Sequence, residues 1–457
     1  MFIDFLEERF KADPDTDALV WRDRVYSYRW LADRLSSWRE RLAVEQIGQG
    51  EVVILEADFS PTSVALFLAL LDRGCILVPL TSAVGAKRNE FVAIAQGEAT
   101  IRVAPDDSVI VERLAGAADH VHYQALRAKG HPGLVLFSSG STGKSKAAVH
   151  DFVPLLEKFR ITRARLRSIS FLLFDHIGGI NTMLYMLSNT GCLITVEDRR
   201  PTAVLKAVQD HRVELLPATP TFLNLLLISE ADRDFDLSSL QMVTYGTEPM
   251  PETTLKSLHA RLPNVRLVQT YGLSEIGIMR SKSKSSDSIW VKLGGEGFET
   301  RVVDGILHVK AASAMLGYLN APSPFTADGW FDTQDRVEVE GEYFRILGRD
   351  SELINVGGQK VYPAEVESII QVLDNVAEVT VFGEPHPITG NIVCARVSTI
   401  EPTDDKALRK AIRQACREQL ESFKVPVKIE VTQERQYSER FKKIRRRPSD
   451  GPATVEG

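Results

Sequence analysis

Short apolar stretches alternate with amphipathic segments up to about residue 290 of the chain. Residues 2–42 predict a helix, a short hairpin and a second helix. The next segment predicts a strand VVILEA, a helix from Ser63 to Leu71 and a strand CILVPL. Strands that are apolar throughout are typical of a parallel sheet buried on both faces. The alternation recurs in LVLFS, a helix after His150, SISFLLF, CLITVE, VELLPA, MVTYG and RLVQTYG, so we expect a doubly wound α/β architecture.

The pattern changes beyond this point. Between Glu299 and Leu347, short strands with Asp304-Gly305 and Glu340-Gly341 turns predict β-hairpins. From Ser351 to Arg445 the chain predicts a compact α+β unit. Its helices are expected at Pro363–Val372 and Lys406–Ser422, and its strands at EVTVFG, NIVCARVS and VPVKIEV.

Composition narrows the class of protein. The 55 Lys and Arg residues against 61 Asp and Glu give a net charge of −6, which offers no electrostatic reason to bind nucleic acid or an anionic membrane. No apolar run is long enough to span a bilayer, and acidic residues interrupt the N-terminal MFIDFLEERF where a signal peptide would be apolar. The four cysteines form no CxxC pair, which argues against a disulfide framework or a zinc site and favours a reducing, cytoplasmic location. They are Cys75, Cys192, Cys394 and Cys416.

A loop rich in glycine and hydroxyl residues is the most distinctive feature. It lies within Leu134 to Lys146, LVLFSSGSTGKSK, where an apolar strand is expected to run through the loop into a helix. Gly140 and Gly143 let backbone N–H groups converge, and hydroxyl and ammonium groups add donors, which suits a polyphosphate. The candidate side chains are those of Ser138, Ser139, Ser141, Thr142, Lys144 and Lys146.

Two other interpretations of the loop are weaker. A Walker A loop, G-x-x-x-x-G-K-[ST], would need its first glycine at Ser138, so that pattern fails by one position. A flexible surface linker is disfavoured because the loop directly follows a buried strand.

The loop resembles the phosphate loop of the adenylate-forming superfamily, S/T-S-G-S/T-T-G-x-P-K-G. Ser145 replaces the usual proline and Ala147 the usual glycine. This superfamily contains acyl-CoA synthetases, adenylation domains of peptide synthetases and luciferases. The resemblance implies that the loop residues bind the phosphates of ATP and that Thr142 takes part in catalysis.

Further motifs follow in the order that this superfamily has. QTYGLSE resembles Y-G-x-T/S-E: Tyr271 can stack on adenine, Ser274 can reach a phosphate and Glu275 offers a carboxylate to Mg²⁺. An ordinary strand end with a turn is the alternative for this segment. The neighbouring Gly272 and Ile276 are expected to line the nucleotide site and the acid pocket, respectively.

Four more segments carry site residues by the same resemblance. TYGTEPMP resembles the strand and turn along the adenine and the acyl pocket, and contributes Gly246, Thr247 and Glu248. GWFDTQD resembles G-W-x-x-T-G-D, which assigns Asp335 to the ribose, although Gln334 replaces the usual glycine. FDHIGG resembles the segment that gates the acyl pocket, which makes His176 a pocket candidate; a core histidine is the alternative. Arg349 in LGRDSEL is expected to contact the ribose.

The C-terminal part resembles the small domain of these enzymes. Gly357, Gly358 and Lys360 resemble a hairpin that enters the site for the second half-reaction. SERFKKIRR resembles T-x-x-G-K-I-x-R, and Lys443 is taken as the catalytic lysine because Ile444 and Arg446 then match. Lys442 then stands where glycine is usual and remains a second candidate. A solvated basic tail is the alternative for this run.

The resemblance covers almost the whole chain and implies an overall organisation. We expect a large N-terminal domain at residues 1–348, made of doubly wound α/β subdomains and a distorted β-barrel. A hinge at 349–351 and a small, mobile α+β domain at 352–457 should follow. The implied enzyme is an AMP-forming acid–thiol ligase. It would use ATP and Mg²⁺ to convert a carboxylic acid to an acyl-adenylate, with release of pyrophosphate, and then acylate coenzyme A or the phosphopantetheine of a separate carrier protein.

Two other functions stay open at this stage. Asp175 beside His176 could serve as a base for an amine acceptor, which would make the protein an amide ligase. The replacements at Ser145, Ala147, Gln334 and Lys442 are compatible with a non-catalytic nucleotide-binding homologue.

Overall fold

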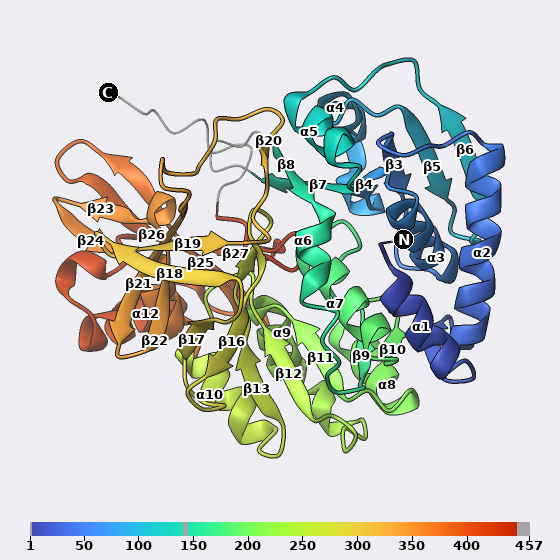
Figure 1. Ribbon diagram of the computed structural model, residues 1–457. Helices are drawn as coiled ribbons and strands as arrows, with labels where there is room; N and C mark the ends of the chain where they lie inside the picture. The colour runs from blue at the N-terminus through green and yellow to red at the C-terminus, as the bar shows by residue number, and fades with distance from the viewer. Residues whose placement is uncertain (1, 140–144, 446–457) are drawn as a thin grey trace.

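The computed structural model describes residues 2–139 and 145–445, and Figure 1 shows how they are arranged. The chain begins with the expected helix, hairpin and helix. These are α1 (Asp4–Ala12), β1 (Asp17–Trp21), β2 (Arg24–Ser27) and α2 (Tyr28–Val44). Ser27 starts α2, since its hydroxyl accepts a hydrogen bond from the N–H of Trp30 at 3.3 Å.

A first seven-stranded sheet has the order β20-β8-β7-β4-β3-β5-β6. It contains the predicted βαβ unit, in which β3 (Val52–Glu56) and β4 (Ile76–Leu80) are parallel and joined by α3 (Pro61–Asp72). The remaining strands are β5 (Ala99–Val103), β6 (Val109–Arg113), β7 (Gly133–Ser139), β8 (Ser145–Asp151) and β20 (Gly317–Tyr318); η1 (Ser82–Lys87), α4 (Arg88–Ile94), α5 (Val121–Lys129) and α6 (Phe152–Glu157) accompany them.

The helix expected after His150 is confirmed as α6, but it does not follow the glycine-rich loop directly. Residues Ser145–Asp151 form β8, which pairs antiparallel with β7 on one side and with β20 on the other. The loop therefore joins two strands, and α6 begins only at Phe152. The predicted site residues Gly140, Ser141, Thr142, Gly143 and Lys144 lie outside the described residues.

A second seven-stranded sheet has the order β13-β12-β11-β9-β10-β1-β2 and confirms the doubly wound prediction. Its strands β9 to β13 pair in parallel, while β2 forms an antiparallel edge with β1. The strands are β9 (Arg167–Ile169), β10 (Cys192–Ile194), β11 (Leu215–Ala218), β12 (Met242–Tyr245) and β13 (Arg266–Gln269). The helices are α7 (Ile177–Ser188), α8 (Pro201–Asp210), α9 (Pro220–Ser229), η2 (Ala231–Arg233) and α10 (Glu252–Arg261).

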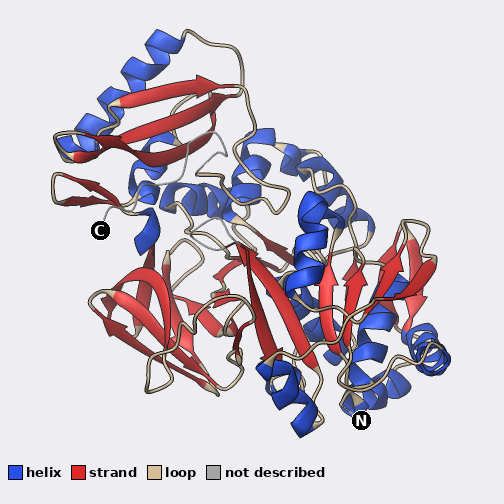
Figure 2. Cartoon of the chain, turned by 90° about the horizontal axis from the view of Figure 1, so that it is seen from above, coloured by secondary structure: helices blue, strands red, loops and turns tan. Residues whose placement is uncertain are grey.

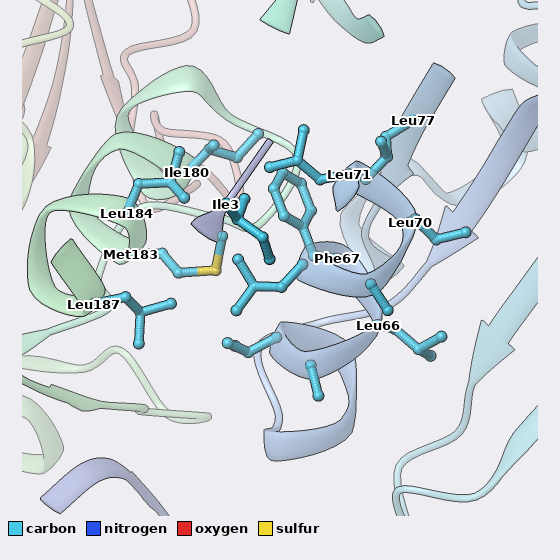
Figure 3. Close-up of a cluster of buried hydrophobic side chains, with 14 of the residues drawn as sticks. Ile3, Leu66, Phe67, Leu70, Leu71, Leu77, Ile180, Met183, Leu184 and Leu187 are labelled. Carbon is cyan, nitrogen blue, oxygen red and sulfur yellow. The ribbon is translucent and has the colours of Figure 1, made fainter. Parts of the chain in front are cut away.

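The largest hydrophobic core lies where α3 and α7 pack together (Figure 3). Every residue of α3 from Pro61 to Leu71 is buried, as expected of a helix that is apolar on all sides. Phe67 of α3 and Met183 of α7 are both fully buried in this cluster, and Ile3 from the N-terminus packs beside them. This core fixes the start of α7, which carries His176 at its N-cap.

A six-stranded antiparallel sheet stands where the distorted β-barrel was predicted, in the order β16-β17-β22-β21-β19-β18, and we call it the half-barrel. Asp304 and Gly305 have φ angles of 51° and 80°, which are typical of the type I′ turn predicted between β18 and β19. The strands are β16 (Arg280–Ser283), β17 (Trp290–Gly294), β18 (Phe298–Val303), β19 (Ile306–Ala311), β21 (Phe331–Glu340) and β22 (Tyr343–Arg349); the short pair β14 (Gly272–Leu273) and β15 (Gly277–Ile278) precedes them. We call residues 2–349 the large unit.

The small unit, residues 350–435, stands apart from the other sheets in Figure 2. It contains a five-stranded sheet, β24-β23-β26-β25 with β27 beside β26. The elements are η3 (Asp350–Glu352), β23 (Ile354–Val356), β24 (Gln359–Val361), α11 (Pro363–Ile370), β25 (Val376–His386), β26 (Gly390–Thr399), α12 (Asp405–Gln419), η4 (Ser422–Lys424) and β27 (Lys428–Thr432). Residues 436–445, the C-terminal segment, then run back between the two units.

Two observations concern the whole of the described chain. All four cysteines are buried and unpaired. Within residues 2–139 and 145–445, helices are either too short or too polar to cross a membrane.

Candidate active site

A cavity of about 250 Å³ lies where the C-terminal segment meets the second sheet. His176 is positioned there as the N-cap of α7, because its Nδ1 accepts the N–H of Gly178 at 3.0 Å. Burial lowers the pKa of His176 well below its usual range, so the ring is neutral and carries its proton on Nε2. The lining residues are Phe171, Leu172, Leu173, His176, Arg199, Thr247, Arg440 and Lys442.

The loop after β12 supplies the opposite wall of this cavity. A Cβ at Gly246 would lie 2.6 Å from the carbonyl oxygen of Thr270, so only glycine allows the loop to approach the end of β13 this closely. Thr247 has a φ of 75°, a strained value for a β-branched residue, and it lines the cavity. Strain of this kind is common in binding sites.

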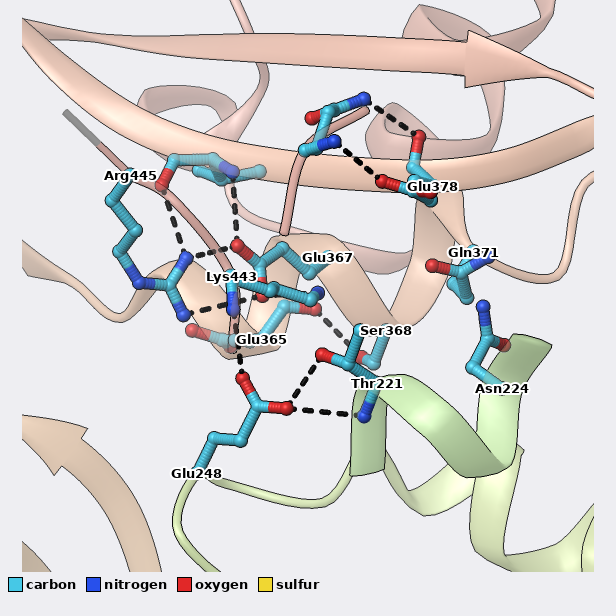
Figure 4. A network of polar contacts seen from close by, with 12 residues as sticks. Thr221, Asn224, Glu248, Glu365, Glu367, Ser368, Gln371, Glu378, Lys443 and Arg445 are labelled. Atoms are coloured by element: carbon cyan, nitrogen blue, oxygen red, sulfur yellow. Dashed lines mark hydrogen bonds and ion pairs between the residues drawn. The ribbon is translucent and has the colours of Figure 1, made fainter. Parts of the chain in front are cut away.

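Glu248 in the same loop has a different environment from its neighbours. Its Oε1 accepts hydrogen bonds from the N–H of Thr221 at 3.0 Å and from the hydroxyl of Thr221 at 2.5 Å. Its Oε2 accepts the backbone N–H of Lys443 at 3.2 Å (Figure 4). The carboxylate expected near the nucleotide therefore links the start of α9 to the C-terminal segment.

Lys442 and Lys443 face different surroundings. Lys442 lines the cavity with His176 and Thr247, and burial lowers its pKa to about 8. The ammonium of Lys443 lies 2.9 Å from Oε2 of Glu367 on α11, in the small unit.

Phe441 has a φ of 51°, a conformation that favours glycine. If Ser438 matches the threonine of T-x-x-G-K, Phe441 takes the glycine position and Lys442 the lysine position. The geometry favours Lys442 over Lys443 as the lysine of this cavity.

The structure brings together the predicted ribose-binding residues. Tyr271 donates its hydroxyl hydrogen to Oδ2 of Asp335 at 2.6 Å, and Nε of Arg349 lies 3.5 Å from Oδ1. Burial raises the pKa of Asp335, although Arg349 opposes the shift. Tyr271 itself is buried in a hydrophobic cluster with its hydroxyl committed to Asp335, so its expected role as a stacking surface for adenine gains no support.

Glu275 lies close to the base of the glycine-rich loop. Its Oε1 accepts the hydroxyl of Tyr318 at 2.8 Å, and Ser138 Oγ lies 3.5 Å from the same oxygen. The ammonium of Lys146 lies 5.3 Å from the centroid of the Tyr318 ring. The sequence does not point to Tyr318, because this residue lies 43 positions from Glu275 on a two-residue strand with no recognisable pattern. Of the predicted loop residues, Ser138 thus lies beside Glu275, Lys146 lies over the ring of Tyr318, and Ser139 ends β7.

Glu275 fits the requirements of a magnesium ligand in a nucleotide complex. In the described ranges, 2–139 and 145–445, His, Cys, Asp and Glu do not gather in threes in a way that could hold a metal. Mg²⁺ is nevertheless often held by one or two carboxylates together with substrate phosphates. A single buried carboxylate next to a phosphate-binding loop matches that arrangement.

Residues around Glu275 hold its loop in place. His150 Nε2 donates to the carbonyl oxygen of Ser274 at 2.5 Å, and burial lowers the pKa of His150, which keeps the ring neutral. Gly272 is required because a Cβ there would lie 2.6 Å from the carbonyl oxygen of Gly277. Ile276 is fully buried in the hydrophobic cluster of the half-barrel and does not line the cavity as expected.

The predicted acceptor hairpin lies away from these residues. Gly357 and Gly358 have φ angles of 59° and 88° and form the turn between β23 and β24. Lys360 is exposed, and a Cβ on either glycine would meet no atom of the described chain within 4 Å. Figure 1 places this hairpin on the outer side of the small unit.

A second cavity, of about 520 Å³, separates the two units at their contact. Around it, Nδ2 of Asn224 donates to the carbonyl oxygen of Ala377 at 3.2 Å, and Oγ1 of Thr253 donates to that of Ser368 at 3.3 Å. These are few, partly exposed contacts for units of this size. The arrangement suits an interface that can open.

Comparisons with known proteins identify the family of the chain. The family described as AMP-binding enzyme matches residues 6–319, and its companion, AMP-binding enzyme C-terminal domain, matches residues 365–442. Indoleacetate–CoA ligase of Aromatoleum aromaticum is 25% identical over 453 residues, covering 87% of this chain and 88% of the relative. The anthranilate CoA ligase AuaEII in complex with anthranoyl-AMP has a TM-score of 0.79 at 19% identity, covering 95% of this chain and 93% of that one.

Another similar structure is the amide bond synthetase McbA from Marinactinospora thermotolerans. Its TM-score is 0.75 at 19% identity, with 96% of this chain and 97% of that one covered. At this identity the two structures establish the fold alone, which is a large and a small unit as predicted. The family matches span most of both units and include the cavity, the Glu275 loop and the C-terminal segment up to Lys442. The chain therefore belongs to the AMP-binding enzymes of the adenylate-forming superfamily.

Proposed function

We propose that the protein activates a carboxylic acid with ATP and transfers the acyl group to the thiol of coenzyme A. The observation that carries this proposal is Lys442, a half-buried cation presented to a cavity that also contains neutral His176 and Thr247. The two substrates of such a reaction are both anions. A lysine held in a small, largely apolar cavity is suited to bring them together.

In the first half-reaction, a carboxylate oxygen attacks the α-phosphorus of ATP. The new bond joins that oxygen to phosphorus, the bond to the bridging oxygen breaks, and pyrophosphate leaves with its electron pair. Lys442 would hold the carboxylate and the α-phosphate and stabilise the charge that develops between them. We assign this role to Lys442 and not to Lys443, whose ammonium is paired with Glu367.

Other residues would hold the nucleotide. Asp335 with Arg349 would bind the ribose hydroxyls, and Ser138, Lys146 and the loop between them would bind the phosphates. Glu275 would hold Mg²⁺, which when bound neutralises charge on the phosphates. Tyr318 fixes the orientation of Glu275 through its hydrogen bond.

The second half-reaction requires a different arrangement of the units. We infer that the small unit turns about residues 349–351, which withdraws Lys442 and brings Gly357, Gly358 and Lys360 to the cavity. The thiolate sulfur of the acceptor then attacks the acyl carbon and AMP leaves. Indoleacetate–CoA ligase and the anthranilate CoA ligase are both named for coenzyme A as acceptor, which favours it over a carrier protein.

An amide ligase is the alternative that the similar synthetase raises. Asp175, the candidate base of an amide ligase, already has two polar partners. Its Oδ2 lies 2.7 Å from Nη2 of Arg440 and accepts a hydrogen bond from the hydroxyl of Thr81 at 3.0 Å. A carboxylate paired in this way is poorly placed to take a proton from an amine.

The proposed function is tested with the intact chain and a panel of carboxylic acids. Incorporation of labelled pyrophosphate into ATP that depends on an added acid is the expected result. Coenzyme A, pantetheine and simple amines are then compared as acceptors, and a thioester is the expected product. Absence of exchange with every aryl, alicyclic and alkyl acid of the panel would contradict the proposal, and an amide product would replace its second half.

A further inference from the structure

Three consecutive residues of the C-terminal segment are anchored to the large unit just before Lys442. The carbonyl oxygen of Glu439 accepts a hydrogen bond from Nη2 of Arg199 at 2.8 Å. Nη2 of Arg440 lies 2.7 Å from Oδ2 of Asp175. The ring of Phe441 packs against those of Phe171 and Phe222, with centroids 5.4 Å and 5.7 Å away. Together these contacts fix the backbone from which Lys442 projects.

The ion pair between Asp175 and Arg440 is almost enclosed. The side chain of Asp175 is only 4% exposed, and its Oδ1 has no hydrogen-bond partner among the described residues. Burial raises the pKa of Asp175, while Arg440 and Thr81 favour its charged form. Removing Arg440 leaves a buried carboxylate without a compensating cation, which is strongly unfavourable. The buried carboxylate of Asp175 therefore favours the arrangement in which Arg440 of the C-terminal segment is paired with the large unit.

Phe441 has a backbone conformation that is strained for residues other than glycine. At a φ of 51°, a side chain with a Cβ is disfavoured, whereas glycine is not. The ring is nevertheless buried, with 7% exposed, between Phe171, Phe222 and Tyr437. Aromatic contacts thus offset the strain only while the segment lies on the large unit.

The residues after Lys442 bind the small unit instead. Lys443 and Arg445 both pair with the buried Glu367 on α11 (Figure 4). Nε of Arg445 also lies 3.0 Å from Oε2 of Glu352 in η3. These contacts can persist when the small unit moves. The contacts of residues 439–441 with Arg199, Asp175, Phe171 and Phe222 cannot, because these four partners belong to the large unit.

We propose that Asp175, Arg440 and Phe441 form a dock that positions Lys442 for adenylation and separates before acyl transfer. We assign them positioning roles, because Arg440 is paired with Asp175 and Phe441 packs among aromatic rings, although Arg440 also lines the cavity that Lys442 faces. The inference rests on the proposed function, because it divides the two half-reactions of that function between a docked and an undocked state.

The test compares the two half-reactions in the intact chain. Arg440→Gln and Phe441→Gly should each lower kcat for acid-dependent pyrophosphate exchange by on the order of 10- to 100-fold, since misplacement by about 1 Å can cost about 10² in rate. KM for ATP should change little because the nucleotide contacts lie on other elements. Acyl transfer from a supplied acyl-adenylate to coenzyme A should be retained or accelerated.

Two further variants keep the test decisive. Exchanging the charges, Asp175→Arg with Arg440→Asp, should restore part of the exchange rate lost in Arg440→Asp alone. Arg22→Ala, which removes an exposed ion pair with Glu197, is the matched control and should match the wild type in both half-reactions. Phe441→Gly is expected to fold, because glycine suits the observed φ.

The outcomes are distinguishable. Equal loss of both half-reactions, or full exchange activity in Arg440→Gln and Phe441→Gly, would overturn the dock. Failure of the charge exchange to recover any activity, with a thermal midpoint like that of the wild type, would also overturn it. If the wild type shows no exchange with any acid, the proposed function itself fails.

Discussion

Lys442 and Lys443 are neighbours in the chain, but their ammonium groups lie on opposite sides of the C-terminal segment. One faces a cavity of the large unit and the other a carboxylate of the small unit. This alternation follows from the extended backbone of the segment, in which successive side chains point in opposite directions. A difference of one residue therefore separates a candidate catalytic group from a structural one.

The two lysines should differ sharply when replaced. We expect Lys442→Ala to lower acid-dependent pyrophosphate exchange by about 10²–10³, as for the loss of one preorganised donor. Lys443→Ala should keep exchange within several-fold of the wild type and lower stability instead. Acyl transfer from a supplied acyl-adenylate should survive in both variants. The opposite ranking of the two exchange rates would return the catalytic role to Lys443.

The pH dependence offers an independent check on Lys442. Its pKa of about 8 means that the free enzyme loses this positive charge as pH rises through 8. Because the cation must hold two anions, kcat/KM for exchange should be flat below about pH 8 and fall about tenfold per unit above it. Lys442→Arg, if active, should lack this decline, since a guanidinium stays charged. A decline at the same pH in Lys442→Arg would assign the titration to another group.

At the residue scale, sequence motifs named many side chains of the candidate site, but they did not show which of these side chains contact one another. Asp335, Arg349, Tyr271 and Glu275 were named from local patterns, and the structure brings the first three together. Tyr318 was not named from the sequence, and neither was the contact between Asp175 and Arg440. That contact joins residues 265 positions apart, so no local pattern reveals it. The choice between the two lysines depends on the φ of Phe441, which no residue pattern encodes.

At the scale of elements, apolar strands and amphipathic helices were predictable because burial on both faces dictates their composition. The βαβ unit of β3, α3 and β4 lies within a few residues of its predicted bounds. The glycine-rich loop leads into a strand, and not directly into the expected helix, for a tertiary reason. Ser145–Asp151 contains residues that accept either state, and pairing with β7 and β20 selects the strand.

The packing of α3 on α7 should dominate the stability of the large unit. Phe67 is fully buried in that core, so Phe67→Ala should lower the free energy of unfolding by about 3–5 kcal/mol. Val44, 80% exposed at the end of α2, provides the control, and Val44→Ala should stay within about 0.5 kcal/mol. Urea denaturation followed by tryptophan fluorescence measures both. A loss under about 1 kcal/mol for Phe67→Ala would mean that the core relaxes around the gap.

At the scale of the whole molecule, Glu367 connects the C-terminal segment to the small unit. Burial alone would raise its pKa, but Arg445 and Lys443 outweigh burial and lower the pKa to about 2. Because the folded pKa lies below the unfolded one, this carboxylate stabilises the fold above about pH 4.5. The contribution is lost as pH falls from there toward 2.

Replacing Glu367 should therefore destabilise the small unit. Glu367→Gln leaves Lys443 and Arg445 buried without their carboxylate, and we expect a loss of about 3–5 kcal/mol at pH 7. Glu384→Gln removes an exposed pair with Lys428 and should cost at most about 1 kcal/mol. Calorimetry of both variants at pH 7 and pH 3 is the measurement. The gap between Glu367→Gln and the wild type should narrow at pH 3, and a constant gap would refute the charge argument.

The four buried thiols make this chain a convenient host for chemical labelling. Burial raises the pKa of Cys75, Cys192 and Cys394 to about 12 and that of Cys416 to about 11, so thiolate is scarce at neutral pH and alkylating dyes should find little to react with. Cysteines introduced at Asn224 and Ala377, which face each other across the units, could then carry a fluorophore pair without altering the native thiols. If the units part and rejoin as proposed, energy transfer between the dyes should fall and recover once in each turnover.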